Sequence, residues 1–152
     1  MLKSKFLFIV LLSSFIVSCS SDDVLTPEQE NQKIEEYISS KKLTVTEKTI
    51  SGLRYIQTKP NASGAKLVKG QTINVNYAGR LLSDKQFDAG NFSFTLGVGQ
   101  VVGGFDEGIA KMRVGEKTTI IFPSAIGYGT SGQGAIPAYS PLVFDIEVVS
   151  AK

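Results

Sequence analysis

The stretch FSFTLGVGQVVGGFDEGIAKMRVGE, which runs from Phe92 to Glu116, combines three local patterns in one continuous segment. Its first residues, 92–96, alternate between apolar and polar side chains, as a half-buried strand does. A glycine-rich loop follows. Phe105, Ile109 and Met112 then fall at i, i+4 and i+7, which is the spacing of one apolar helical face. The segment therefore predicts a strand, a loop and one short helix, in that order.

The residues around this helix mark its two ends. Asp106 and Glu107 lie in the first turn, where the helix dipole favours negative charge, and Gly115 follows as a stop signal. The glycines before the helix do not indicate a phosphate loop, because no strand-helix-strand repeat surrounds them and no Lys-Ser or Lys-Thr pair follows.

Strand patterns lie on both sides of this segment. Residues 72–77 and 142–148 alternate between apolar and polar side chains, and residues 52–58 and 117–122 are further candidates. Because the polar positions of such strands need solvent on one face, we predict an antiparallel sheet. One helix packed against an antiparallel sheet is an α+β architecture.

Composition places the chain among single-domain globular proteins and excludes several kinds of catalyst. Its 152 residues are 42% apolar and 9% aromatic, which is enough for one packed core. Histidine is absent, which excludes Ser-His-Asp and Cys-His nucleophile systems. Cys19 is the only cysteine, which excludes a disulfide within the chain and a thiolate metal cluster. We therefore predict neither a metal nor a cofactor.

The charge balance gives no indication of a nucleic-acid partner. The formal net charge is +2, but Lys3 and Lys5 precede the apolar N-terminal run, and without them 14 basic residues face 14 acidic ones. A balanced chain lacks the basic excess that nucleic-acid binding requires.

The N-terminus has the pattern of an export signal. Lys3 and Lys5 precede an apolar stretch that begins at Phe6, and Ile16-Val17-Ser18-Cys19 resembles the lipobox of bacterial lipoproteins, whose cysteine is acylated. We predict a lipoprotein signal peptide over residues 1–18 and a lipid on Cys19, which would hold the protein on a bacterial membrane of the cell envelope.

Two alternatives stay open for this segment. An uncleaved membrane-anchor helix needs about 20 apolar residues, and Ser13, Ser14 and Ser18 interrupt the run. An ordinary secretory signal would leave the thiol of Cys19 unmodified in an oxidising space.

A short helix is predicted from about residue 27 to residue 40. Thr26 is its N-cap candidate, and Ile34, Tyr37 and Ile38 fall at the spacing of one apolar face. This helix can be an arm that spaces the domain from the bilayer or docks on a partner, or it can pack against its own domain.

Five stretches, in order, resemble the FKBP family of peptidyl-prolyl cis/trans isomerases. They are VNYAGRL (75–81), KQFD (85–88), the segment 92–116 quoted above, FPSAIGYG (122–129) and GAIPAYSPLVFDIEVV (134–149). The family fold is a strongly bent antiparallel β-sheet wrapped around one short α-helix, which agrees with the α+β pattern. The resemblance implies an isomerase domain over residues 44–152, preceded by a lipidated N-terminus, polar linker and short helix over residues 19–43.

The resemblance also implies an apolar pocket for the proline ring of X-Pro-containing polypeptides. Asp88, Tyr128 and Tyr77 take the catalytic positions: the Asp88 carboxylate lies beside the twisting amide, where it can hold Tyr77, and the Tyr128 hydroxyl donates to a substrate carbonyl. Phe105 takes the pocket floor, and the backbone N–H of Val102 donates to a second carbonyl. The residues implied to bind substrate are Phe87, Phe94, Val101, Val102, Phe105, Ile136 and Phe144.

Some of these residues can also have a purely structural role. Phe94 and Phe144 lie in strand patterns and can serve the core alone, and Asp88 can be a turn residue.

The sequence departs from the family pattern at the predicted site. The floor is most often tryptophan in the family, and Phe105 is smaller and lacks the indole N–H, which predicts a deeper pocket. The link over residues 89–91 is several residues shorter than in many relatives, and Tyr139 stands where bacterial relatives often have asparagine.

The function implied by the resemblance is prolyl isomerisation that assists the folding of exported proteins. A chaperone-like or docking module that uses the same cleft with little turnover is the alternative, and the missing tryptophan supports it. Some relatives dimerise through N-terminal helices, so the helix over residues 27–40 suggests a homodimer contact.

Overall fold

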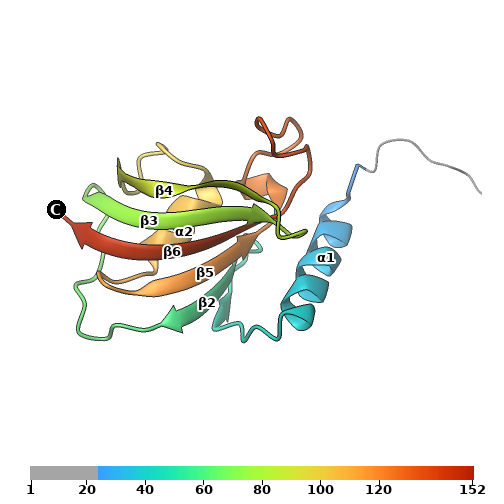
Figure 1. Cartoon of the computed structure of the whole chain (residues 1–152). Coiled ribbons are helices and arrows are strands. Elements are labelled where there is room, and N and C mark those ends of the chain that lie inside the picture. Colours follow the sequence, from blue (N-terminus) through green and yellow to red (C-terminus); the bar gives the residue numbers. More distant parts are fainter. Residues whose placement is uncertain (1–23) are drawn as a thin grey trace, which may run out of the picture.

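The computed structural model of the chain describes residues 24–152. The predicted signal peptide, the lipobox-like segment and Cys19 lie outside the described residues. The elements in chain order are α1 (Pro27–Ser40), β1 (Glu47–Lys48), β2 (Arg54–Lys59), β3 (Thr72–Leu81), β4 (Gln86–Thr95), α2 (Gly103–Ala110), β5 (Lys117–Phe122), the 3-10 turn η1 (Ser124–Ile126) and β6 (Leu142–Ala151) (Figure 1).

The six strands form one sheet in the order β1-β2-β5-β6-β3-β4, and every neighbouring pair is antiparallel. Figure 1 shows the sheet bending around α2, with α1 outside the sheet at the right of the view. The predicted α+β fold, a bent antiparallel sheet around one short helix with a second helix before it, is therefore confirmed.

Strand β4 is longer than the alternating pattern predicted. It begins at Gln86 rather than near residue 92, so the short link over residues 89–91 is itself strand. In its register with β3, Gly79 pairs with Asp88 and Tyr77 pairs with Gly90. This pairing brings Asp88 next to the ring of Tyr77.

Helix α2 packs against the inner face of the sheet and forms the main core. Two of its glycines permit a close approach, because a Cβ at Gly104 would lie 2.5 Å from the Phe122 ring and one at Gly108 would lie 2.7 Å from Ile120. Phe105 and Ile109 project into the core. The helix covers residues 103–110 rather than the predicted apolar span, and Met112 is buried just beyond its end.

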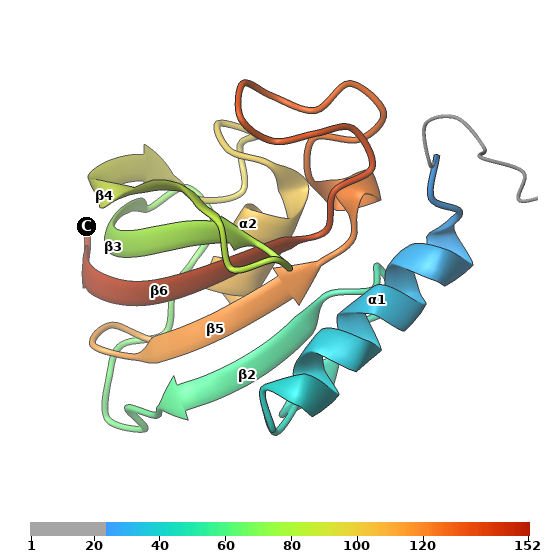
Figure 2. The same cartoon turned by 45° about the vertical axis from the view of Figure 1, so that its right-hand side comes forward.

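Helix α1 packs on the opposite face of the same sheet (Figure 2). Its apolar residues Ile34, Tyr37 and Ile38 contact Ile56, Ile121 and Val143, which come from β2, β5 and β6. Of the two alternatives for this helix, packing against its own domain is the one that the structure shows. A homodimer through α1 would have to use the polar side of the helix, since the apolar side is buried within the chain.

This packing corrects the expectation that one face of every strand is solvated. Residues 118–122 of β5 are buried on both faces, with Ile120 directed to the main core and Ile121 directed to α1. The sequence Thr-Thr-Ile-Ile-Phe shows no apolar-polar alternation at its end because both faces are covered.

Several polar contacts join α1 to the rest of the domain. The carboxylate of Glu35 accepts a hydrogen bond from the fully buried Arg54, with Nη2 at 2.7 Å. The Tyr37 hydroxyl donates to Asp84 at 3.0 Å. Near the start of the helix, Glu30 accepts two hydrogen bonds from Ser124. The helix start is fixed by a capping box between Thr26 and Gln29.

Candidate active site

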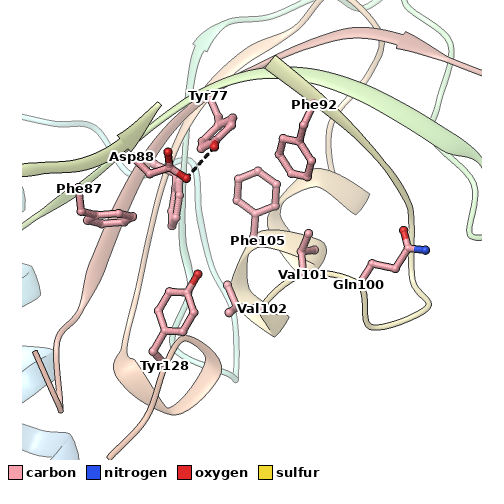
Figure 3. A pocket seen from close by; sticks show the side chains of 10 residues that line it. Tyr77, Phe87, Asp88, Phe92, Gln100, Val101, Val102, Phe105 and Tyr128 are labelled. Atoms are coloured by element: carbon pink, nitrogen blue, oxygen red, sulfur yellow. Dashed lines mark hydrogen bonds between the residues drawn. The ribbon is translucent and has the colours of Figure 1, made fainter. Parts of the chain in front are cut away.

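A cavity of about 470 Å³ opens on the inner side of the sheet, between β4, the loop before α2 and the loop after η1 (Figure 3). It contains eight of the ten residues predicted for the site and two that were not predicted. The lining residues are Tyr77, Phe87, Asp88, Phe92, Gln100, Val101, Val102, Phe105, Tyr128 and Phe144.

The floor of this pocket is an aromatic cluster centred on Phe105. The Phe105 ring is 3% exposed, and its centroid lies 5.1 Å from Phe144, 6.1 Å from Tyr77 and 6.0 Å from Phe92. The Phe144 and Tyr77 rings meet it edge to face, an arrangement that aromatic quadrupoles favour. The floor is therefore apolar and held by rings on several sides.

One charged group reaches this apolar wall. The Tyr77 hydroxyl donates to Oδ2 of Asp88 at 2.7 Å, as Figure 3 shows. This hydrogen bond, together with desolvation and the charge of Asp88, raises the pKa of Tyr77 to about 12. Tyr77 therefore stays a neutral donor at physiological pH and holds the Asp88 carboxylate at the pocket edge.

The two outer aromatic walls can meet because β3 carries a glycine between them. A Cβ at Gly79 would lie 2.6 Å from both Phe87 and Phe144, closer than real side-chain contacts allow. Without that Cβ, the two rings pack edge to face with centroids 5.6 Å apart.

Two loop residues close the other side of the pocket. Val102 has extended backbone at the N-cap of α2, and its carbonyl accepts the N–H of Phe105 at 3.0 Å. Tyr128 stands between Gly127 and Gly129 in the loop after η1, and its hydroxyl points into the cavity (Figure 3). The left-handed backbone of Gly129, with φ of +57°, is a conformation that glycine adopts without strain.

Phe94 and Ile136 were predicted to line the pocket, and the structure places both in the core instead. Phe94 is 4% exposed and stacks on Phe92 at 5.6 Å, so it supports the pocket wall from behind. Ile136 is 6% exposed and follows a tight reversal that pairs it with Gln133, which turns its side chain inward.

Phe92 and Gln100 line the pocket but were missed. Phe92 lies two residues before Phe94 on the same strand face, so the alternation indicated both, and only the degree of burial separates them. Gln100 carries no motif signal. Its side-chain oxygen accepts the N–H of Thr95 at 2.7 Å, which ties the loop before α2 to the end of β4.

This arrangement suits a reaction that twists a bond without making or breaking one. An X-Pro amide isomerises over a barrier of about 18–20 kcal/mol that amide resonance sets. An apolar cup that takes the proline ring and removes water from the amide favours the twisted state, in which resonance is lost. Asp88 and Tyr128 supply polar groups at the rim, and no nucleophile is needed.

The fold is a bent antiparallel sheet around one helix, and its pocket is lined mainly by aromatic and aliphatic side chains with Asp88 at the edge. The family model described as FKBP-type peptidyl-prolyl cis-trans isomerase matches residues 64–149. The chain belongs to this family, and its activity is peptidyl-prolyl cis/trans isomerisation.

Individual relatives agree with this assignment. FK506-binding protein 2 of Dictyostelium discoideum is 38% identical over 104 residues, which cover 64% of this chain and 76% of that protein. The crystal structure of AtFKBP13 matches with a TM-score of 0.64 and 34% identity, over 69% of this chain and 97% of that one. FkpA from Escherichia coli matches with a TM-score of 0.71 and 29% identity, over 82% of this chain and 60% of that one. Some further relatives are longer, and the chain spans 19–31% of their length.

Proposed function

We propose that the pocket binds a proline ring on Phe105 and that Asp88 and Tyr128 act on the amide before it. The observation that carries this proposal is the aromatic pocket with the Tyr77–Asp88 hydrogen bond at its edge. The Tyr128 hydroxyl donates to a substrate carbonyl, and the backbone N–H of Val102, the N-cap residue of α2, donates to a second carbonyl. These are positioning and electrostatic roles, which lower the barrier without proton transfer.

A relaxation assay tests these roles. The experiment uses residues 22–152 and follows the cis/trans relaxation of a short Leu-Pro or Phe-Pro peptide, whose uncatalysed relaxation takes tens to hundreds of seconds. Asp88→Val and Tyr128→Phe should each lower kcat/KM by about tenfold, the size of effect expected from one lost polar contact to the transition state. Tyr139→Phe is the matched control, because Tyr139 borders a different groove and should leave the rate unchanged.

The outcomes of this assay separate the two candidate functions. Equal activity of the parent, Asp88→Val and Tyr128→Phe would remove both residues from the mechanism. A folded parent that binds the peptide without accelerating relaxation would favour the docking module, for which Phe105 in place of tryptophan is the supporting observation. Peptide binding is measured in the same samples by titration calorimetry.

We further propose that this isomerase is held on a membrane of the bacterial cell envelope by a lipid on Cys19 and assists the folding of exported chains. The export signal and the lipobox-like segment support this proposal. Four residues lie between Cys19 and Val24, so the five Cα–Cα steps between them span at most about 18 Å. Such a short tether keeps the domain close to the membrane, where newly exported chains emerge. No helix within residues 24–152 has the length and apolar character to cross a bilayer.

The anchor is tested by metabolic labelling of the full chain with a radioactive fatty acid in a bacterial host. The parent should incorporate label and enter the detergent phase, and Cys19→Ser should do neither. A cleaved but unlabelled parent would support the ordinary secretory signal, and an uncleaved membrane-bound parent would support the anchor helix. Either result would overturn lipidation.

A further inference from the structure

Glu30 is a buried carboxylate on α1 that the proposed mechanism does not use. It is 4% exposed, although it lies in the first turns of a helix whose other glutamates are exposed. Its Oε2 accepts the backbone N–H of Ser124 at 2.7 Å and its Oε1 accepts the Ser124 hydroxyl at 2.6 Å. Both oxygens are therefore committed to one residue, which lies 94 positions further along the chain.

Ser124 also hydrogen-bonds to the loop that carries the pocket residue Tyr128. Its carbonyl accepts the N–H of Gly127 at 2.8 Å and the N–H of Gly129 at 2.9 Å. These two glycines flank Tyr128, whose hydroxyl points into the pocket (Figure 3). The chain of hydrogen bonds thus runs from α1, through Ser124, to the backbone on both sides of Tyr128.

The glycines make this loop dependent on such a contact. A Tyr between two glycines has few backbone restraints of its own, since glycine visits conformations that other residues do not. A buried carboxylate, in contrast, is costly unless its hydrogen bonds are made, so Glu30 favours the one loop geometry that presents both Ser124 donors.

We propose that Glu30 is a positioning residue for prolyl isomerisation, which acts through Ser124 to fix the Tyr128 hydroxyl at the pocket. This makes α1 part of the catalytic unit, beyond its role as a cover for the outer face of the sheet. The inference rests on the proposed role of Tyr128 in substrate binding.

Kinetics of two Glu30 variants test the proposal. Glu30→Ala removes both acceptors and should raise KM for the X-Pro peptide about fivefold with kcat nearly unchanged, within the range of coupled contacts. Glu30→Gln keeps an acceptor for the Ser124 N–H and offers an N–H to the Ser124 hydroxyl oxygen, so it should stay within about twofold of the parent. Ile38→Val is the matched control, because it weakens the packing of the same helix without touching Ser124.

A double-mutant cycle separates positioning from general destabilisation. In a Tyr128→Phe background, Glu30→Ala should cause no further rise in KM, because the hydroxyl that it positions is absent. Additive effects of the two changes, or an equal loss in Ile38→Val, would show that Glu30 only stabilises the fold and would overturn the proposal.

A second readout does not depend on activity. In ¹H–¹⁵N spectra of residues 22–152, Glu30→Ala should shift the amide signals of Gly127 and Gly129, and Ile38→Val should leave them in place. Unshifted glycine amides in Glu30→Ala would overturn the proposed link. If those amides move but Tyr128→Phe leaves catalysis intact, the link stands and the proposed role of Tyr128 is the part that fails.

Discussion

The two faces of the sheet carry helices that do different work. On the outer face, α1 spans Pro27–Ser40 and covers Ile121 and Val143 completely, so this side is closed. On the inner face, α2 spans Gly103–Ala110 and leaves the space beside β4 open. The open region is walled by aromatic rings that stay partly exposed. The difference indicates that one helix seals an apolar face for stability, whereas the other leaves an apolar face exposed for a ligand.

The same strands form both faces, so neighbouring residues of one strand contact different helices. In β6, Phe144 is directed to the pocket and its neighbour Val143 is directed to α1. In β5, Ile120 and Ile121 divide in the same way. Substitutions can nevertheless address one face at a time, because neighbouring side chains of a strand point to opposite faces.

The largest expected effect comes from opening the closed face. Ile34 is 0% exposed at the centre of the α1 contact. Ile34→Ala should lower the free energy of unfolding by about 3 kcal/mol, within the range for a buried large-to-small change. Urea unfolding measures this loss, and kcat/KM per folded molecule should change little at a temperature where the variant remains folded.

Lys33→Ala is the control for that change, since Lys33 lies on the exposed side of the same helix and its replacement should leave stability within about 0.5 kcal/mol. An Ile34→Ala variant as stable as the parent would mean that α1 does not close the outer face in solution.

A smaller effect on stability, but a direct effect on catalysis, is expected from crowding the open face. Gly79→Ala places a Cβ 2.6 Å from Phe87 and Phe144, which forces both rings to move. We expect a loss of about 1–3 kcal/mol in stability, typical of overpacking, and a rise in KM as the pocket wall is displaced. Urea unfolding and peptide relaxation measure the two effects.

Gly90→Ala provides a matched comparison on the adjacent strand. Its added Cβ would lie 3.7 Å from the Tyr77 ring, an ordinary contact, and should disturb neither stability nor KM appreciably. If the two glycine variants behave alike, the close approach at Gly79 does not shape the pocket.

The sequence predicted those features of the two sheet faces that depend on residues close together in the chain. The capping box and the spacing of Ile34, Tyr37 and Ile38 are local, and they predicted the bounds of α1 correctly. The face that receives α1 was not predicted, because Ile56 and Ile121 come from distant strands. Residues 117–122 were predicted as a strand with one solvated face, and the structure shows Thr118–Phe122 buried on both faces because α1 covers the second one.

The site was predicted to the same degree and for the same reason. Motif spacing placed Tyr77, Asp88 and Tyr128 around one pocket, because the family fold fixes their positions in the sheet and loops. It could not distinguish the half-buried Phe92 from the buried Phe94, which share one strand face. Both rings lie about equally far from Phe105, with centroids 6.0 Å and 5.9 Å away, so the difference in their burial comes from the surrounding tertiary packing, which has no local signature.

The smallest expected effect is on the titration of Tyr77, whose hydroxyl donates to Asp88 at the pocket edge. The Asp88 carboxylate is the main cause that raises the pKa of Tyr77 to about 12 from an ordinary value of 10.0. Asp88→Asn should therefore return that pKa toward 10, which the absorbance of the phenolate at alkaline pH measures, with Tyr77→Phe identifying the signal of this ring.

The same shift gives stability a defined pH dependence. A tyrosine whose folded-state pKa is raised contributes stability below the unfolded pKa of about 10 and loses it as the pH rises through about 12. The stability difference between the parent and Asp88→Asn should consequently narrow across that window. A parent in which Tyr77 ionises near pH 10 would show that Asp88 does not hold this hydroxyl in solution. The Asp88 carboxylate would then lack a fixed partner on the open face, whereas α1 on the outer face would keep its hydrogen bonds to Arg54 and Ser124.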